Sequence, residues 1–529
     1  MDFDAIVIGS GFGGAIMACR LAEANYRVLV LERGRRWDKS SYPRQAGDMW
    51  TWNQEHPERE HGWIDLRVFP HMSVVQGAAV GGGSLIYANI SCEAPESAFD
   101  VGWPREITYA ELKPYYDKVA KFMNVQRVPA NQWTNRMRLM KEAADKTDSS
   151  ARFKQLELAV SFAPGWTYEE PDCFNLIHSN RFVNAQGVNQ GTCVHLGNCD
   201  IGCDADAKNT LDRNYIPWAE KHGAEVRPLQ LVNDIQPVDG GYKVSSDSLE
   251  NGTRTARSQT ARIVILAAGS LGSTELLLRC REINGTLPQI SPFVGRNWSS
   301  NGDFLTPAFY ASREVDPSRG PTIASAIDFL DRSVDGQSFW IEDGGFPNVL
   351  FDYITRLDQD ANNIAAKSII DGFRHIWGGA EPFAKVMPWF GQGVDAANGT
   401  LSMHHSILTG KPYLSLAWDI GRSKQLIDAM VATHLKLSTA TGGLPVVPPT
   451  WSICHSLITP HPLGGCGMGD SMINGVVDHA GRVFNYDNLY VVDGSIVPEA
   501  LGVNPSRTIG ALAERAAALL CTREGRPGA

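Results

Sequence analysis

A run of glycines near the start of the chain is the segment best suited to hold a phosphate. It follows an apolar stretch that ends at Ile8 and reads Gly9-Ser10-Gly11-Phe12-Gly13-Gly14. The first glycine permits a tight turn, Gly11 lets backbone N–H groups approach a pyrophosphate, and Gly14 lets a helix lie close to a strand. Glu32 follows about 20 residues later, the offset at which an acid accepts from a ribose hydroxyl. The pattern predicts a dinucleotide site.

These residues need a strand, a helix and a second strand to position them. The hydrophobic pattern predicts a strand over residues 5–8, a helix over 15–24 and a strand over 27–31. The helix N-terminus then faces the phosphate charge. FAD and NAD both fit this unit. Because the sequence holds no second glycine motif of this kind, we expect the one bound nucleotide to be the redox cofactor itself.

A similar arrangement occurs near the C-terminus. Residues 489–492 read as a strand that ends at Asp493-Gly494, and Asn504-Pro505-Ser506 leads into a helix predicted over 508–520. The N-terminus of that helix, aimed at a flavin ring, would favour the anionic reduced form through its partial positive charge and free N–H groups.

Two other patterns suggest different chemistry. Ser270 lies in Ala268-Gly269-Ser270-Leu271-Gly272, which is similar to the nucleophile elbow of serine hydrolases. That fold needs an acid and then a histidine after the serine, and with Asp493 as the acid no histidine follows. Cys193, Leu196, Cys199 and Cys203 fall on a ferredoxin-like spacing, but a leucine cannot bind iron, and His195 is misplaced as a fourth zinc ligand. We therefore expect no metal.

The composition is that of a folded protein with more than one domain. The 529 residues suggest two to four folding units, and a net charge of -10 without blocks of like charge argues against nucleic acid as a partner. No apolar run approaches the length of about 18 residues that reads as a membrane span. The start of the sequence leaves no room for a signal peptide, and its cysteines are sparse, so we expect a cytoplasmic protein.

Six segments in the same order resemble the glucose-methanol-choline (GMC) oxidoreductase family, and within it the cholesterol oxidase-like branch. They are the first glycine run with Glu32; Val80-Gly81-Gly82-Gly83-Ser84-Leu85; residues 267–273; residues 295–303; His461-Pro462-Leu463-Gly464-Gly465-Cys466; and residues 493–505. A weaker match is the segment through Val232, similar to a strand whose valine touches the adenine. The family often has Asn two residues after Ser-Leu, whereas here the asparagine is Asn89.

The resemblance implies FAD as the cofactor and assigns its contacts. The implied residues are Gly9, Ser10, Gly11, Phe12, Gly13, Gly14, Glu32, Gly81, Gly82, Gly83, Ser84, Asn89, Val232, Gly269, Asp493, Gly494, Asn504 and Pro505. It also implies an α/β fold, in which an FAD-binding Rossmann-like domain is built from residues 1–95, 191–303 and 455–529. Residues 96–190 and 304–454 would form an α+β substrate-binding domain with a mostly antiparallel sheet, to which 400–404 and 413–418 are expected to contribute.

Alcohol oxidation requires a base and a second anchor over one face of the flavin. His461 is the expected base because imidazole accepts a proton near neutrality, and Asn504 is the expected hydrogen-bonding partner of the substrate hydroxyl. His455 is the fallback for the base. In cholesterol oxidase-like enzymes a glutamate also moves protons during double-bond isomerisation, and the resemblance places it at Glu381, although a solvated loop carboxylate is the alternative.

The resemblance implies oxidation of a bulky hydrophobic alcohol, with a 3-hydroxysteroid first and an allylic, terpenoid or aromatic alcohol as the alternative. Oxygen or another carrier would take the electrons. Aromatic residues that could line an apolar pocket, or equally fill a core, are Trp340, Phe373, Trp377, Phe383, Trp389 and Phe390. A serine hydrolase and an FAD-binding module without enzymatic activity are the remote alternatives.

Overall fold

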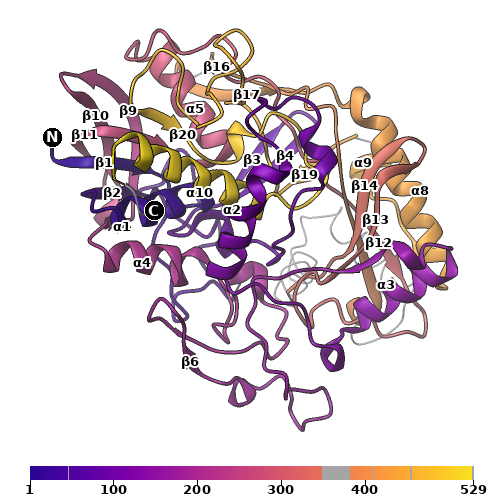
Figure 1. The fold of residues 1–529 in the computed structure, drawn as a ribbon. Coiled ribbons are helices and arrows are strands. Elements are labelled where there is room, and N and C mark those ends of the chain that lie inside the picture. Colours follow the sequence, from indigo (N-terminus) through magenta and orange to yellow (C-terminus); the bar gives the residue numbers. More distant parts are fainter. Residues whose placement is uncertain (46, 348–381, 408, 453–454, 527–529) are drawn as a thin grey trace.

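The computed structural model describes residues 1–45, 47–347, 382–407, 409–452 and 455–526. Two large sheets organise these residues, one mixed and one antiparallel, with helices on their outer faces (Figure 1). The expected α/β class is confirmed.

The mixed sheet has seven strands, in the order β8-β2-β1-β11-β10-β9 with β20 paired to β11. Five strands run parallel, β1, β2, β8, β11 and β20, whereas β9, β10 and the first half of β11 are antiparallel. The strands are β1 (Phe3–Ile8), β2 (Val28–Leu31), β8 (Glu225–Arg227), β9 (Gln230–Val238), β10 (Gly241–Ser248), β11 (Thr255–Leu266) and β20 (Leu489–Val491). They come from three separated stretches of the chain.

Both faces of the parallel part are covered, because residues 5–8 of β1, 28–31 of β2, 263–266 of β11 and 489–491 of β20 are apolar and buried. Ala5 and Val7 of β1 pack into one core, which contains residues of α1 (Phe12–Glu23), α4 (Tyr215–Lys221) and α10 (Ser506–Arg523). Ile6 and Ile8 pack into the other core, which contains residues of α5 (Gly269–Glu282). The helices α1 and α10 begin a few residues before the predicted positions and pack against each other, and α2 (Tyr109–Phe122) packs on α10.

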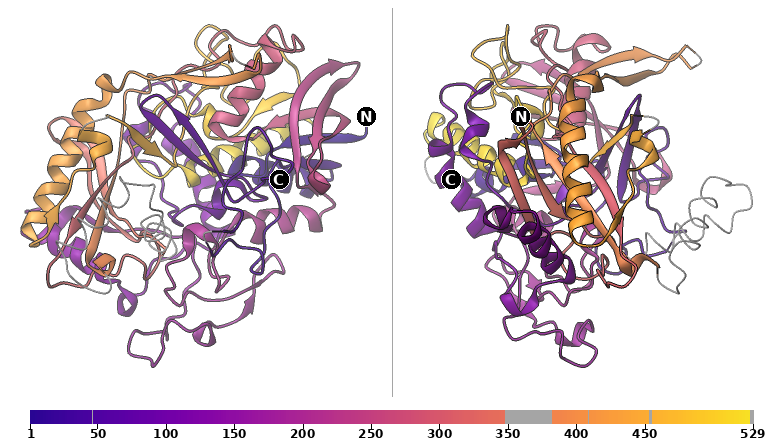
Figure 2. Two further views of the ribbon diagram at one scale, coloured as in Figure 1. Left: turned by 180° about the vertical axis from the view of Figure 1, so that it is seen from behind. Right: turned by 90° about the vertical axis from the view of Figure 1, so that its right-hand side faces the viewer.

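The antiparallel sheet has six strands in the order β18-β12-β15-β14-β13-β5. They are β5 (Phe153–Gln155), β12 (Phe304–Phe309), β13 (Ser325–Val334), β14 (Gln337–Asp343), β15 (Val386–Gly393) and β18 (Leu444–Pro445). The helices α3 (Asn135–Lys146) and α8 (Lys424–Ala440) pack on this sheet and on each other. In the views of Figure 2 α8 lies on the outside of the sheet, which leaves the other face toward the mixed sheet.

Three smaller sheets complete the fold. β3 (Ile64–Phe69), β4 (Met72–Gly77) and β19 (Leu457–Thr459) form one, and β6 (Phe182–Val183) pairs with β7 (Asn189–Gln190). β16 (Thr400–His405) and β17 (Pro412–Ala417) pair antiparallel as predicted, but as a separate two-stranded sheet next to α5. The predicted contribution to the main antiparallel sheet is therefore wrong. The short helix α9 (Pro449–Ser452) precedes β19.

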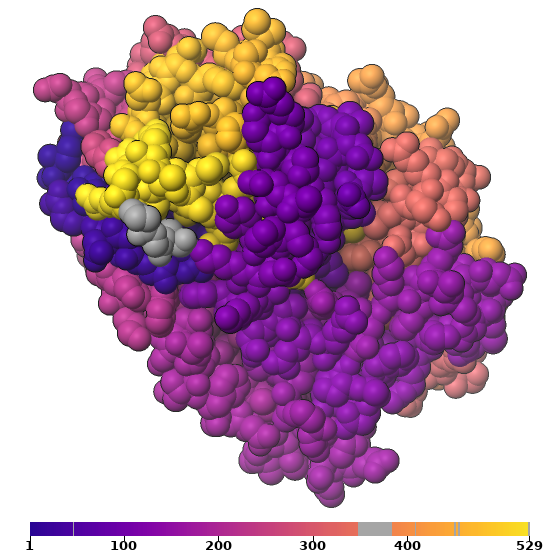
Figure 3. Space-filling view, in the orientation of Figure 1, coloured from indigo at the N-terminus to yellow at the C-terminus, as the bar shows by residue number. Residues whose placement is uncertain are grey.

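Segments far apart in the sequence meet on the surface. In the space-filling view the yellow C-terminal segment lies between the indigo N-terminal segment and the purple segment near residue 100 (Figure 3). Among the described residues, no helix has both the length and the hydropathy that crossing a bilayer requires.

Candidate active site

A cavity of about 1790 Å³ opens at the carboxyl ends of β1, β2 and β11, where ligands of doubly wound sheets bind. Its wall is completed by residues of β12 and β15 in the antiparallel sheet and of the β16–β17 hairpin. The predicted site residues that line it are Gly9, Gly11, Phe12, Gly13, Glu32, Gly82, Gly83, Val232, Gly269, His461, Asp493, Gly494, Asn504 and Pro505.

The first glycine run is shaped by close backbone packing. Gly9 has φ 95°, and a Cβ atom there would lie 2.3 Å from the Ala267 carbonyl oxygen. A Cβ at Gly13 would lie 1.6 Å from the Val492 oxygen, and one at Gly14 would lie 2.0 Å from the Gly9 oxygen. At Gly11 a Cβ would meet no atom within 4 Å. Three of these glycines serve the fold, and Gly11 leaves open space at the cavity wall.

That open space lies at the N-terminus of α1. Gly11 is the N-cap residue, and no side chain accepts from the first amides of the helix. Free N–H groups and the helix dipole make such a position suitable for a phosphate. Glu32 lines the same cavity at the end of β2, so a phosphate cradle and a ribose acceptor occur together. The residues present therefore fit a dinucleotide such as FAD.

Glu32 is held in place by backbone and side-chain donors. Its carboxylate accepts from Ser10 N at 2.9 Å, from Ser10 Oγ at 2.7 Å and from Gly34 N at 2.9 Å. Burial raises the pKa of the Glu32 carboxyl, and these three hydrogen bonds oppose that rise. These hydrogen bonds fix the Glu32 carboxyl, and Glu32 still lines the cavity.

Several predicted contacts lie behind the wall instead of on it. Ser84 Oγ donates to the Gly81 oxygen at 2.7 Å and accepts from Leu211 N at 3.0 Å, which fixes the second glycine loop. Asn89 is fully buried, has φ 71°, and its side-chain polar atoms have no partner. The predicted residues that do not line the cavity are Ser10, Gly14, Gly81, Ser84 and Asn89. Glu381 lies outside the described residues.

His461 faces the cavity with a buried carboxylate behind it. Its Nδ1 lies 3.0 Å from both Oδ1 and Oδ2 of Asp303, which is 1% exposed. The Thr459 hydroxyl donates to Asp303 Oδ2 at 2.6 Å. Burial raises the pKa of Asp303, while His461 and Thr459 act in the opposite direction. Because a carboxylate only accepts, this geometry places a proton on Nδ1, and Nε2 is the ring nitrogen that does not contact Asp303.

The backbone around His461 is rigid for identifiable reasons. The residue follows β19 and lies between Pro460 and Pro462, whose rings fix φ. After it the chain turns through Gly464 and Gly465, which have φ 76° and 102°. Ser270 Oγ donates to the Gly464 oxygen at 2.8 Å, so this serine holds the turn. That bond occupies the hydroxyl that the serine hydrolase alternative would use as its nucleophile.

Asn504 also lines the cavity, and a second asparagine fixes the loop that carries it. Asn301 Nδ2 donates to the Val503 oxygen at 2.9 Å, and its Oδ1 accepts from the backbone N–H groups of Leu501 and Gly502, both at 2.9 Å. Asn504 is not the cap of α10, since Pro505 occupies that position. Its Oδ1 is buried and has no partner.

Asp493 connects the end of β20 to the start of α5. Oδ2 accepts from Gly269 N at 2.9 Å and from Ser273 Oγ at 2.5 Å, and Oδ1 accepts from Ser495 N at 2.8 Å. Burial raises the pKa of Asp493. These bonds bring Gly269 and Gly494 to the same stretch of cavity wall.

Core packing explains two of the aromatic residues named from the sequence, Trp340 and Trp389. Phe390 lines the cavity, and its ring centroid lies 6.3 Å from that of His461. Trp340 and Trp389 are buried in the antiparallel sheet and do not line this cavity, and neither does Phe383. Phe373 and Trp377 lie outside the described residues. For Trp340 and Trp389 the pocket-lining interpretation is therefore wrong.

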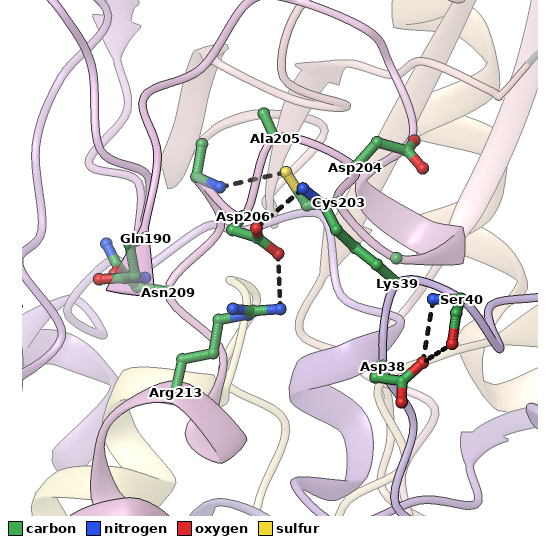
Figure 4. A network of polar contacts seen from close by, with 12 residues as sticks. Asp38, Lys39, Ser40, Gln190, Cys203, Asp204, Ala205, Asp206, Asn209 and Arg213 are labelled. Carbon is green, nitrogen blue, oxygen red and sulfur yellow. Dashed lines mark hydrogen bonds and ion pairs between the residues drawn. The ribbon is translucent and has the colours of Figure 1, made fainter. Parts of the chain in front are cut away.

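Ion pairs hold the cysteine-rich loop, which contains Cys193, Cys199 and Cys203. Asp206 accepts from Lys39 at 2.9 Å and from Arg213 at 2.7 Å, and Ala207 N donates to Cys203 Sγ at 3.3 Å (Figure 4). Cys193 and Cys199 are buried free thiols. In the described part of the chain, no group of three or more His, Cys, Asp or Glu side chains is arranged to hold a metal ion.

Two acidic residues of this site were not predicted. Asp303 ends a segment that the family resemblance includes, but nothing in its local sequence indicates that it faces His461. Glu342 lies on β14, is fully buried, and forms a hydrogen bond with the Asn504 side chain that lowers the pKa of its carboxyl. The pairing of β14 with β15 places Glu342, so the local sequence pattern held no signal for it.

Comparisons with known proteins agree with this geometry. Family models described as GMC oxidoreductase match residues 3–299 and 397–513. A cholesterol oxidase of Acinetobacter baumannii is 32% identical over 97% of this chain and 94% of that protein, and one of Mycobacterium tuberculosis is 30% identical over 98% and 91%. The structure of pyridoxine 4-oxidase from Mesorbium loti has a TM-score of 0.62 and 17% identity, covering 97% of this chain and 98% of that one.

Proposed function

The chain belongs to the GMC oxidoreductase family and is an FAD-dependent oxidoreductase acting on CH–OH groups, and on that premise we propose its substrate and its base. The substrate is a bulky hydrophobic secondary alcohol, foremost a 3-hydroxysteroid, which is oxidised to the carbonyl compound. His461 is the base. The steroid assignment is supported by the two relatives named cholesterol oxidase, which match over nearly the full length of this chain.

The observation that carries the proposal is the pairing of His461 with Asp303 at the cavity wall. Both oxygens of the buried carboxylate lie 3.0 Å from Nδ1, so the proton is held on that nitrogen. The opposite nitrogen, Nε2, then has a lone pair available on a residue that lines the cavity. A general base needs this tautomer to take a hydroxyl proton.

Each residue has one part in the reaction. His461 Nε2 takes the proton of the alcohol hydroxyl, and the positive charge that forms is stabilised by Asp303. Asn504 donates a hydrogen bond to the alcohol oxygen and so orients the carbon that bears the hydride. Bound FAD supplies the acceptor for that hydride. Gly11 and the amides at the start of α1 would hold its phosphates, and Glu32 would hold a ribose.

The cavity walls near His461 suit an apolar skeleton. Leu305 and Phe390 project from neighbouring strands of the antiparallel sheet, where they are paired in register, and Ile323 and Phe346 lie on the same wall. Such a wall excludes water from the reacting carbon and favours ring systems over sugars. His461 and Asn504 line the same cavity and supply polar groups to it.

The proposal is tested by mixing the yellow protein anaerobically with a panel of alcohols. We expect a 3β-hydroxysteroid to bleach the flavin faster than allylic, terpenoid or aromatic alcohols do, and the rate of recolouring in air to show whether oxygen accepts the electrons. His461→Ala should slow bleaching by about 100-fold or more, as expected for a lost general base.

His455→Ala is the matched control, because His455 is exposed and does not line the cavity. It should bleach at the wild-type rate. An unchanged rate in His461→Ala would remove the base from the proposal, and faster bleaching by a non-steroid alcohol would remove the steroid.

A further inference from the structure

The chain around His461 has few backbone donors. His461 lies between Pro460 and Pro462, and a proline carries no backbone N–H. His461 therefore supplies the one backbone donor of these three residues. That N–H donates to Oγ1 of Thr459, two positions earlier, at 2.9 Å. A hydroxyl that accepts from the N–H two residues further on forms a local turn, so the Thr459 side chain sets the course of the chain into His461.

The same hydroxyl faces the acid that pairs with the imidazole. Thr459 Oγ1 lies 2.6 Å from Asp303 Oδ2 and 2.9 Å from the Ser300 oxygen. A hydroxyl has a single proton to donate. The contact with the carboxylate is the shorter one, and a hydrogen bond to an ionised acceptor is the stronger one, so the proton points to Asp303. Thr459 thus accepts from the backbone of His461 and donates to the acid that His461 faces.

The surroundings of this hydroxyl are dry. Thr459 is 0% exposed and does not line the cavity, whereas His461 does. Burial and the negative charge of Asp395 raise the pKa of Asp303, while His461 and Thr459 lower it. Because Thr459 is shut off from solvent, water does not replace its hydroxyl as a donor to the carboxylate.

A second contact joins the same two stretches of chain on the other side of the imidazole. Ser299 and Leu463 exchange both backbone hydrogen bonds, at 2.9 and 3.0 Å. Residues 459–463 are therefore joined to residues 299–303 at both ends, through the backbone of Leu463 after His461 and through the side chain of Thr459 before it.

The stretch 299–303 is itself held by a buried acid. Asp395 accepts from Ser299 Oγ and from both N and Oγ of Ser300, each at 2.8 Å. Asn301 of the same stretch holds the loop that carries Asn504 by three hydrogen bonds. A side chain that fixes the imidazole on this stretch therefore also fixes it relative to Asn504.

We propose that Thr459 is a positioning residue for the base, whose hydroxyl accepts from the His461 backbone, donates to Asp303 and so fixes the imidazole relative to its carboxylate. Through residues 299–303 it also fixes the placement of the imidazole relative to Asn504. This inference deepens the proposed function, because it rests on His461 as the base.

Two substitutions with opposite expectations test this role. Thr459→Val keeps the branched shape but removes the hydroxyl, so flavin reduction by the best alcohol should slow by about 10-fold or more, as for a lost hydrogen bond to a charged group. Thr459→Ser keeps the hydroxyl, so its rate should stay within about 3-fold of wild type. Thr433→Val is the matched control, because Thr433 is a buried residue of α8 whose hydroxyl donates to the Ala429 oxygen, away from the cavity.

A role in the fold alone would change other properties as well. Since Thr459 does not line the cavity, Thr459→Val should bind FAD with the Kd of wild type. Thr459→Ala, which removes the hydroxyl and adds no atom, should lose as much activity as the valine variant. Weakened FAD binding in these two variants, equal losses in the valine and serine variants, or a wild-type rate without the hydroxyl would each overturn the proposal.

The hydrogen bond behind the base is measurable without turnover. The proton that His461 Nδ1 donates to Asp303 should give a low-field proton NMR signal in the oxidised holoenzyme, assigned by its loss in His461→Ala. This signal should persist in Thr459→Ser and broaden or vanish in Thr459→Val. An unchanged signal in the valine variant, or none in the wild type, would contradict the inference whatever the rates are. If no alcohol bleaches the wild-type flavin, the proposed function fails, yet the signal still reports on Thr459, so the two failures are distinguishable.

Discussion

At the scale of single residues, two polar side chains that line the cavity each interact with a buried acid. His461 Nδ1 lies 3.0 Å from both carboxyl oxygens of Asp303, and the Asn504 side chain forms a hydrogen bond with Glu342 that lowers the pKa of that carboxyl. Burial raises the pKa of both acids.

Replacing Asp303 tests the first of these pairs. In Asp303→Ala the imidazole loses the group that holds its proton on Nδ1, so we expect flavin reduction to slow by about 10- to 100-fold. The measurement is the rate of anaerobic bleaching in stopped flow.

Asp303→Asn keeps an oxygen that can accept from Nδ1, and its loss should be smaller than that of the alanine variant. If the alanine variant reduces its flavin at the wild-type rate, Asp303 does not orient the base. If the asparagine variant is slower than the alanine variant, the tautomer argument is wrong.

His461 and Asn504 could be named from the sequence because each lies in a short motif. Asp303 and Glu342 could not be named in the same way. Glu342 reaches Asn504, 162 positions further along the chain, only through the pairing of β14 with β15 and the packing of the two sheets. Strand register over such separations is not encoded in local patterns, and a buried acid in an apolar strand has no periodic signature.

At the scale of elements, the glycines of residues 9–14 serve two purposes, close packing and ligand binding. Gly13 and Gly14 allow α1 to lie against the ends of β20 and β1, whereas a Cβ atom at Gly11 would meet no other atom within 4 Å. The sequence predicted this turn correctly because its determinants are local. It failed for the β16–β17 hairpin, whose strands were recognised but whose location depends on contacts with α5.

Two alanine substitutions should separate these functions. Gly13→Ala places a methyl group against the Val492 carbonyl and should lower the stability of the apoprotein by about 1–3 kcal/mol or more, as overpacking does. Gly11→Ala should leave apoprotein stability nearly unchanged but raise the Kd for FAD by about tenfold or more, because its methyl group occupies space that the phosphates need. Thermal unfolding and fluorescence titration with FAD measure the two effects.

The opposite result would be informative. A Gly11→Ala protein that binds FAD with wild-type affinity would mean that the phosphates lie elsewhere in the cavity. A Gly13→Ala apoprotein as stable as wild type would mean that α1 can move away from β20 at little cost.

At the scale of the whole molecule, the cavity is assembled from separated stretches of chain. Residues 9, 11–13, 82–83, 269–270, 493–494 and 504–505 all line it, and residues 305 and 390 come from the other sheet. A ligand that contacts all these residues links segments of the chain that otherwise contact one another only through packing. FAD should therefore stabilise the fold as a unit.

That stabilisation has a calculable size. A ligand that binds only the folded state adds about 2.7 kcal/mol at a free concentration 100 times its Kd. The Tm of the apoprotein should rise by several degrees as FAD is added and continue to rise with its concentration, as scanning calorimetry would record. Riboflavin, which lacks the phosphates and the adenosine, is the control and should raise Tm less. A Tm independent of FAD would mean that the nucleotide does not connect these segments.

The position of β20 has a consequence for biosynthesis. This strand pairs with β11 at the end of the parallel part of the mixed sheet and is followed by Asn504 and α10, so that part is completed by residues that are made long after β1, β2 and β11. At about 5–20 residues per second, the nascent N-terminal half remains without its final strand for tens of seconds. During that interval residues 264–266 of β11 keep an unpaired apolar edge, which is the kind of edge that favours aggregation of a nascent chain.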